Sequence, residues 1–334
     1  MKTKVNEKIN VSGMSWKIVA LSICCNWLLA CTAKSTDMTY AEISNGLITA
    51  KIHLPDSEKG YYQATRFDWA GVITDLEFEG HTYFGQWFAK YDPKIHDAIC
   101  GPVESFTEIG YDQATVGEEF LRIGVGGLLK EDDSIYDAFK LYPISNPGIW
   151  KVRKSANRII FTHKVKDAAG YSYLYSKTVL LPKGQPELIL KHTLKNTGKK
   201  AIATDVYNHN FFIIDREPTG PDIKITFPFD VVGQWNRDDS LAVIEGNTIR
   251  YTRDFRPRET VYMDDIQGHT RSVKDYDFSI ENLKTRAGVR ITCDRPISKI
   301  VFWASATTSC PEPYIDINVP PGEQMEWTNT YTFY

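Results

Sequence analysis

Two short segments of the sequence carry residues that could do acid–base chemistry. In the first, a histidine stands between two asparagines near the end of a strand-like run, in Asn208-His209-Asn210. In the second, a carboxylate stands between two prolines, in Pro311-Glu312-Pro313. Proline fixes the backbone on both sides of Glu312 and restricts where its carboxylate can lie. An imidazole and a carboxylate are the minimum for general acid–base catalysis, so we predict His209 and Glu312 as catalytic residues.

Both residues also have a plain structural interpretation. The ring of His209 could satisfy loop carbonyls, and Glu312 could be a solvated carboxylate in a rigid turn. The choice between these interpretations depends on whether the fold brings the two segments together.

The elements that must position them are β-strands. Clusters of Gly, Pro, Asn and Asp separate the strand-like runs, and no long amphipathic helix follows residue 30. No repeat or linker-like shift in composition divides the chain, so we predict one all-β domain, residues 41–334, built as an antiparallel sandwich with long loops. The runs richest in β-branched and aromatic residues are Leu47–Leu54, Arg158–Val165, Tyr171–Leu181, Leu188–Leu194, Lys224–Phe229, Val289–Cys293 and Lys299–Ala304.

One of these runs leads directly to His209. Apolar and polar residues alternate through Leu188–Leu194, which predicts one buried and one solvated face. The turn-forming Asn196-Thr197-Gly198 follows, and the chain returns as Ala201–Val206. The pattern predicts a hairpin that places His209 just past the end of its second strand, where site residues are common.

The N-terminus resembles a bacterial lipoprotein signal. Four lysines precede an apolar run, residues 18–30, that is too short to span a bilayer comfortably. The run ends in Leu28-Leu29-Ala30-Cys31, which is similar to a lipobox. We predict a signal peptide at residues 1–30, lipidation of Cys31, a tether at residues 31–40 and a position in the bacterial cell envelope, on the periplasmic or surface side of the outer membrane. An ordinary secretory peptide, an uncleaved anchor and a start at Met14 are the alternatives.

Charge and cysteine usage exclude some classes of protein. Residues 1–30 contain four lysines and one glutamate, so their removal changes the formal charge from −3 to −6. This acidic balance argues against nucleic acid as a partner. Cys100, Cys293 and Cys310 remain after Cys31, which allows one disulfide without implying it. The sequence has no CxxC and no His pair spaced for a metal, so we predict neither a metal nor an organic cofactor.

Several segments together resemble the aldose 1-epimerase, or galactose mutarotase-like, superfamily. A strand, Lys195-Asn-Thr-Gly198 and a second strand lead to the Asn-His followed by aromatics that members of this family carry. Cys310-Pro-Glu-Pro-Tyr314 is similar to the family's Glu-Pro-aromatic segment, and Pro320-Pro-Gly-Glu323 to its closing turn. The resemblance covers mainly residues 185–215 and 285–334. It implies a large antiparallel β-supersandwich with a sugar cleft on one face.

The resemblance also implies roles for the two candidate catalytic residues. His209 would protonate the ring oxygen of a sugar while Glu312, as the base, takes the proton of the anomeric hydroxyl. The ring would then open and reclose on either face. The family usually has a second histidine before a glycine, where this chain has Cys100-Gly101, and His96 is the nearest replacement.

Further residues are candidates for binding the sugar. Arg66 could hold hydroxyls or a carboxylate bidentately, and Trp69 could stack on an apolar sugar face, as could Trp87. Asn208, which is next to His209 in the sequence, and His96 are further polar candidates. Asp275 roughly matches a family aspartate that binds hydroxyls. The alternatives are that both tryptophans are core, that Arg66 pairs with Asp68 and that Asp275 serves a turn.

These residues, with the resemblance, predict a carbohydrate-active enzyme, an isomerase of the aldose 1-epimerase type. A hydrolase or lyase acting on a modified or acidic saccharide in the same cleft is the first alternative. A non-catalytic carbohydrate-binding lipoprotein is the second. The expected partners are a mono- or oligosaccharide and, through the lipid anchor alone, a membrane.

Overall fold

The computed structural model describes residues 39–236 and 240–334. The predicted signal peptide, Cys31 and most of the predicted tether therefore lie outside the described residues. The described residues belong to one compact unit. Within the described ranges it is built from antiparallel strands and two short 3-10 helices, η1 (Ile214–Arg216) and η2 (Val273–Asp275), which confirms the predicted all-β, single-domain fold. No helix in these ranges is long and apolar enough to cross a membrane.

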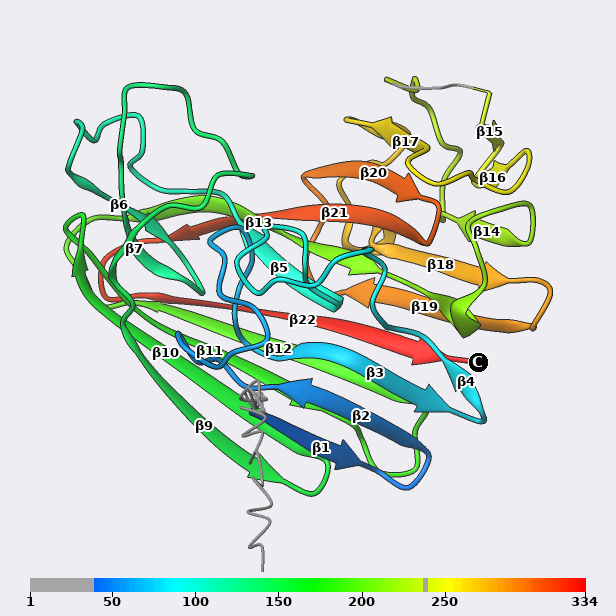
Figure 1. Ribbon diagram of the computed structural model, residues 1–334, viewed down its shortest axis with the longest axis horizontal. Coiled ribbons are helices and arrows are strands. Elements are labelled where there is room, and N and C mark those ends of the chain that lie inside the picture. The colour runs from blue at the N-terminus through cyan, green and yellow to red at the C-terminus, as the bar shows by residue number, and fades with distance from the viewer. Residues whose placement is uncertain (1–38, 237–239) are drawn as a thin grey trace, which may run out of the picture. The chain divides into compact units, whose positions relative to one another are not determined.

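The largest layer is a ten-stranded antiparallel sheet (Figure 1). Each strand-like run named above overlaps a strand of the structure. The sheet's strands, in spatial order, are β15 (Ala242–Glu245), β16 (Thr248–Tyr251), β14 (Ile223–Thr226), β18 (Asp277–Asn282), β19 (Ala287–Cys293), β22 (Gln324–Phe333), β12 (Glu187–Asn196), β11 (Tyr171–Leu180), β10 (Arg158–Ala168) and β9 (Ile149–Ser155).

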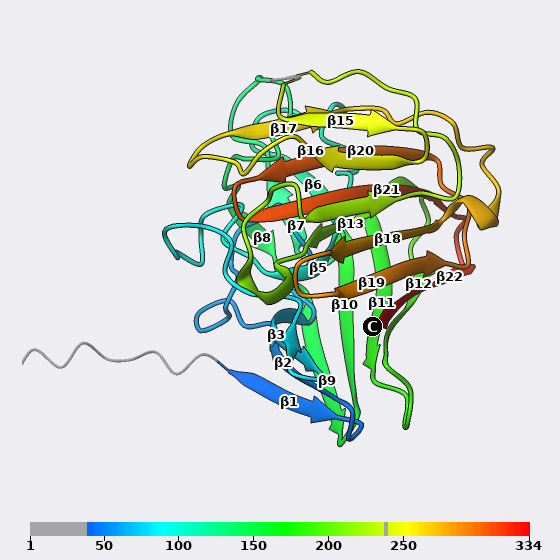
Figure 2. The same ribbon diagram turned by 90° about the vertical axis from the view of Figure 1, so that its right-hand side faces the viewer.

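A five-stranded sheet carries both predicted catalytic segments. In Figure 2 its strands β17, β20, β21 and β13 follow one another in this order. Their bounds, with β5, are β17 (Thr260–Met263), β20 (Lys299–Ser305), β21 (Thr308–Val319), β13 (Ile202–Phe211) and β5 (Gly101–Phe106).

Two smaller sheets complete the described fold. The first has four strands and the second has three, and the segment that holds Phe139 connects the last two strands of the second sheet. Their strands are β1 (Tyr40–Ser44), β2 (Ile48–His53), β3 (Val72–Phe78) and β4 (His81–Thr82), and β6 (Glu119–Arg122), β7 (Gly126–Leu129) and β8 (Ile144–Asn146).

The predicted hairpin before His209 is wrong, although its strands exist. β12 has the predicted alternation of buried and exposed side chains, but it pairs with β11 and β22 in the large sheet. β13 pairs with β21 and β5 in the five-stranded sheet. The turn at Asn196–Gly198 therefore carries the chain from one sheet to the other. The two sheets bury apolar faces against each other, so β12 and β13 lie in different layers.

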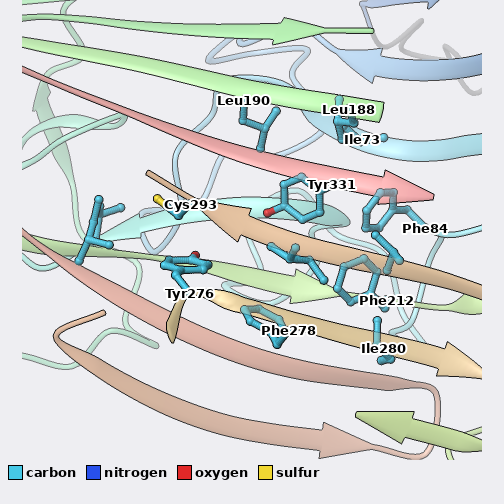
Figure 3. Close-up of a cluster of buried hydrophobic side chains, with 14 of the residues drawn as sticks. Ile73, Phe84, Leu188, Leu190, Phe212, Tyr276, Phe278, Ile280, Cys293 and Tyr331 are labelled. Atoms are coloured by element: carbon cyan, nitrogen blue, oxygen red, sulfur yellow. The ribbon is translucent and has the colours of Figure 1, made fainter. Parts of the chain in front are cut away.

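The two sheets enclose the hydrophobic core. Phe106 of β5 lies edge-on to Tyr175 of β11 and to Trp327 of β22, with ring centroids 5.5 and 6.2 Å apart. Farther along, Phe212 stacks on Phe84 at 5.3 Å, and Figure 3 shows this pair among side chains of the large sheet such as Leu190 and Tyr331. Burial of these aromatic rings holds β5 and the residue that follows β13 against the large sheet.

The three cysteines in the described part of the chain are buried and free. Cys100 immediately precedes β5, Cys293 ends β19 and Cys310 lies in β21. The disulfide that the sequence allowed does not form.

Candidate active site

Backbone pairing between β13 and β21 is interrupted where the predicted catalytic residues lie. The ladder ends with the pair Tyr207–Tyr314, and the strands meet again at the bridge between Phe212 and Ser309. Both pairs belong to the same strand register, and this register places His209 opposite Glu312. The prolines on either side of Glu312 have no N–H to give to the ladder, which accounts for the interruption. This segment, for which a rigid turn was the alternative interpretation, is thus part of strand β21.

The side chains of His209 and Glu312 face each other across this interruption. Nε2 of His209 lies 3.2 Å from Oε1 of Glu312, and the two side chains are 5% and 6% exposed. The imidazole stacks on the ring of Phe211, with centroids 3.7 Å apart and planes 9° from parallel. Among the described residues, Nδ1 of His209 has no hydrogen-bond partner. Stacking and the contact with Glu312 therefore set the orientation of the ring.

Burial moves the pKa values of the two groups in opposite directions. It raises the pKa of Glu312 to about 8, a rise that the nearby charge of Arg66 limits. Burial, reinforced by Arg66, lowers the pKa of His209 well below its usual value. At neutral pH a neutral carboxyl thus faces a neutral imidazole, and the pair holds one proton that can pass between Oε1 and Nε2. Transfer of that proton gives a carboxylate base and an imidazolium acid without changing the net charge.

The pair lies in a pocket of about 550 Å³. Strands β13, β21, β20 and β17 supply most of its residues, and segments from the first half of the chain supply the rest. The lining residues are Arg66, Trp87, Asp97, Phe139, Tyr207, His209, Phe211, Thr260, Tyr262, Val301, Trp303, Glu312 and Tyr314.

A chain of polar contacts forms one side of the pocket. Arg66 makes an ion pair with Asp97 and donates from its second terminal nitrogen to the hydroxyl of Tyr207 over 3.3 Å. Asp97 also contacts Nε2 of His96 at 3.1 Å. Burial opposes ionisation of Asp97, but the bond from His96 and the charge of Arg66 hold its pKa below the usual value. The pocket therefore contains a fixed cation and a fixed anion beside the protonated Glu312.

Aromatic rings form much of the remaining surface. Trp87 stacks on Phe211 at 4.9 Å and meets the edge of Trp303 at 5.3 Å. Tyr207 and Tyr314 stack on each other at 4.4 Å. Flat apolar faces combined with a few fixed polar groups are typical of small-molecule sites and suit the apolar faces of sugars.

The structure brings part of the predicted binding set to this pocket. Arg66 lines it, and its ion-pair partner is Asp97 instead of Asp68, the partner in the alternative interpretation. His96 is not among the lining residues, but it contacts two of them, Asp97 and Phe139. Trp87 lines the pocket as well, as the sugar-stacking interpretation requires.

Three predicted binding residues lie away from the pocket. Asn208 faces the opposite side of β13, because neighbouring strand residues alternate, and donates to Glu104 over 3.0 Å. Trp69 is core, and its indole nitrogen donates to the carbonyl of Ala64. The carboxylate of Asp275 caps η2 by accepting from backbone nitrogens of Thr270 and Ser272. The structural interpretation therefore fits these three residues.

The sequence alone did not single out Asp97, Tyr207, Trp303 or Tyr314. The alternation of strand side chains would have predicted Tyr207 and Tyr314, since each lies two residues from a predicted catalytic residue on the same strand face. Asp97 and Trp303 carry no such local signal. Cys100 does not line the pocket; its buried Sγ lies 3.3 Å from the hydroxyl of Tyr61, and burial raises its pKa to about 12, so it remains a thiol at neutral pH.

No family model matches the chain, and no curated protein sequence matches it. Solved structures do match. A galactose mutarotase-like protein from Lactobacillus casei has a TM-score of 0.52 and 13% identity, with 89% of this chain and 100% of that chain covered. A galactose mutarotase related enzyme from Lactobacillus acidophilus has a TM-score of 0.53 and 12% identity, with 89% of this chain and 97% of that chain covered. An aldose epimerase homologue from C. elegans has a TM-score of 0.52 and 15% identity, with 89% of this chain and 99% of that chain covered. The chain therefore has the galactose mutarotase-like fold, as the resemblance implied.

Proposed function

We propose that this protein interconverts the anomers of an aldose, with Glu312 as base and His209 as acid. The observation that carries the proposal is the contact between these two side chains in a pocket lined by aromatic rings and polar groups. The mutarotase-like fold supports it, since the structures that share the fold include a galactose mutarotase related enzyme and an aldose epimerase homologue.

The proposed reaction uses the single proton of the pair. In the form that acts, Glu312 is a carboxylate and His209 an imidazolium. The anomeric hydroxyl gives its proton to Glu312 while His209 gives its proton to the ring oxygen, and the bond between the anomeric carbon and that oxygen breaks. Rotation about the next carbon–carbon bond and the reverse transfers close the ring on the other face. Each turnover returns both protons.

Polarimetry tests the proposal directly. The protein, starting just after Cys31, is added to freshly dissolved α-glucose and α-galactose, and the optical rotation is followed beside the Glu312→Gln variant. We expect faster equilibration that the variant loses. A folded protein that does not accelerate any aldose tested would contradict the proposal.

One observation favours hydrolysis as the second candidate. The pocket holds a carboxyl protonated at neutral pH, Glu312, and a carboxylate kept ionised, Asp97. Carboxyl groups whose pKa values are pushed apart in this way suit the acid and the base of glycoside cleavage. Chromatography of glycosides after incubation would show released sugar, which anomer exchange cannot produce. A lyase would instead produce ultraviolet absorbance from an unsaturated product.

We also propose that the protein is a lipoprotein anchored at Cys31. The apolar run and the lipobox-like segment support this assignment. Metabolic labelling with a radioactive fatty acid should mark the protein and fail to mark the Cys31→Ser variant. Equal labelling of both would contradict it.

A further inference from the structure

The pocket has an exposed aromatic ring that the proposed reaction does not use. Phe139 lines the pocket, yet 56% of its surface is exposed. It lies in the segment between β7 and β8. A large apolar side chain held at the mouth of a pocket offers a flat surface to whatever enters.

Its ring is held in place by neighbours on the polar side of the pocket. The guanidinium of Arg66 lies 4.8 Å from the ring centroid of Phe139 and 4.7 Å from that of Phe67. The imidazole of His96 meets Phe139 at 4.9 Å with the planes 67° apart. Arg66 thus lies against both rings, and Phe139 is fixed by cation–π and edge contacts instead of by burial.

The backbone that carries Phe139 is also anchored. Asp137 accepts from the backbone nitrogen of Phe139 over 2.8 Å, and the carbonyl of Lys140 accepts from the hydroxyl of Thr65 over 3.2 Å. Nearby, the ring of Tyr136 stacks on Tyr142 at 5.5 Å with the planes 6° apart. Little ordering entropy would therefore be lost when a ligand binds here.

A buried arginine joins this segment to the pocket. Arg122 donates to the backbone carbonyl of Arg66 over 2.6 Å, to the hydroxyl of Ser105 over 2.9 Å and to the hydroxyl of Tyr136. Its side chain is 4% exposed. Arg122 is therefore a positioning residue that ties Arg66 and the Phe139 segment to β5.

Phe139 is connected to the His209–Glu312 pair through two further side chains. The ring of Phe67 meets that of His209 at 5.6 Å and lies against the guanidinium of Arg66, which in turn lies against Phe139. A pyranose whose anomeric carbon is held at the catalytic pair fills only part of a 550 Å³ pocket. The exposed ring and the charged pair beside it suit a second sugar ring.

We propose that the site takes the reducing end of an oligosaccharide, with the neighbouring glycosyl unit bound on Phe139, Arg66 and Asp97. The apolar face of that unit stacks on Phe139. Its hydroxyls accept from the guanidinium and donate to the carboxylate. This inference rests on the proposed function for the placement of the first sugar.

The test compares monosaccharides and disaccharides on matched variants. The probes are glucose and galactose against maltose, cellobiose and lactose, each a reducing sugar. Phe139→Ala removes the stacking surface. Ile135→Ala is the control, since Ile135 is 89% exposed on the same segment and does not line the pocket.

The measured quantity is kcat/KM for anomer exchange, as a ratio of disaccharide to monosaccharide. At least one disaccharide should exceed its monosaccharide in the unaltered protein. Phe139→Ala should lower that ratio by about three- to tenfold, the range for one aromatic stacking contact, while Ile135→Ala leaves it unchanged. A ratio that Phe139→Ala does not change would overturn the subsite.

Binding separates failure of the subsite from failure of the proposed reaction. Calorimetric titration of Glu312→Gln with the same sugars needs no turnover. Tighter binding of a disaccharide that Phe139→Ala removes would support the subsite even if no sugar is converted. Equal binding of disaccharides and monosaccharides would overturn it, whatever the polarimeter shows.

Discussion

Two buried carboxylates of the five-stranded sheet, one on each of its faces, each contact a histidine. On the pocket side, Oε1 of Glu312 lies 3.2 Å from Nε2 of His209, which stacks on Phe211. On the core side, Oε1 of Glu104 lies 2.9 Å from Nε2 of His192, which stacks on Trp327 at 4.7 Å. The two contacts are alike in atoms, burial and stacking.

Their neighbours make them different. Burial opposes ionisation of Glu104 too, but its ion pair with Lys177 and its contact with His192 lower the pKa to about 2. Glu312 has no cation in direct contact among the described residues, and burial raises its pKa to about 8. A buried carboxylate that is given an ammonium partner becomes a permanent anion, whereas one left with an imidazole alone keeps a proton that can move.

Exchanging each histidine for glutamine should separate the two roles most clearly. His209→Gln removes the acid and should slow anomer exchange by about 10²–10⁴-fold, the usual contribution of a positioned proton donor. His192→Gln keeps a side chain that can donate to Glu104 and should reduce the rate far less. Rates from polarimetry on equal amounts of folded protein check this. Equal reductions of the rate in the two variants would contradict a catalytic role for His209 that His192 lacks.

Removing the ammonium group of Lys177 should make the buried carboxylate of Glu104 destabilising. Lys177→Met leaves Glu104 buried without its main compensating charge and should lower the free energy of unfolding by roughly 3–5 kcal/mol. Denaturant titration measures the loss. The double variant Glu104→Gln with Lys177→Met should recover part of it, and a single variant as stable as the unaltered protein would contradict the assignment.

The pH dependence of the reaction should follow the pocket pair alone. Arg66, Asp97 and Lys299 are the charged groups that influence Glu312, whose proton is lost near pH 8. Above that pH the carboxylate faces a neutral imidazole, so the pair lacks the proton that the ring oxygen needs. Since His209 gains a second proton only well below pH 6.5, kcat/KM should be level from pH 6.5 to 7.5 and about tenfold lower at pH 9. A rate that rises through pH 8, after subtraction of the uncatalysed reaction, would exclude this scheme.

Glu312→Gln should also change how the stability of the protein depends on pH. Glu312 has a folded-state pKa of about 8, above its ordinary 4.5, so the folded protein binds more protons than the unfolded chain between these values. The free energy of unfolding therefore falls as the pH rises through this window. Glu312→Gln lacks this term, so its Tm relative to the unaltered protein should increase from pH 5 to pH 8. The lowered pKa of His209 is common to both proteins and cancels if Gln leaves it unchanged.

Local patterns predicted much of the fold because strands are read from alternation and burial. They also located His209 and Glu312, since each stands in a distinctive neighbourhood. They failed for Asn208, because adjacent strand residues face opposite sides and the neighbour of His209 therefore points away from the pocket. They failed as well for the hairpin, because a turn sequence does not state which sheet the next strand joins. Asp97 and Trp303 reach the pocket through long-range packing, which no short window of sequence contains.

The three buried thiols allow opening of the molecule to be followed region by region. Each is separated from solvent by a different part of the fold: Cys100 before β5, Cys293 in the large sheet and Cys310 in β21 beside Glu312. Burial raises the pKa of every one of them, so modification requires local exposure as well as ionisation. With single-cysteine variants, alkylation rates under native conditions would report how often each part opens. Protection of Cys310 by a bound sugar would show that ligand closes the strand pair in which the candidate active site lies.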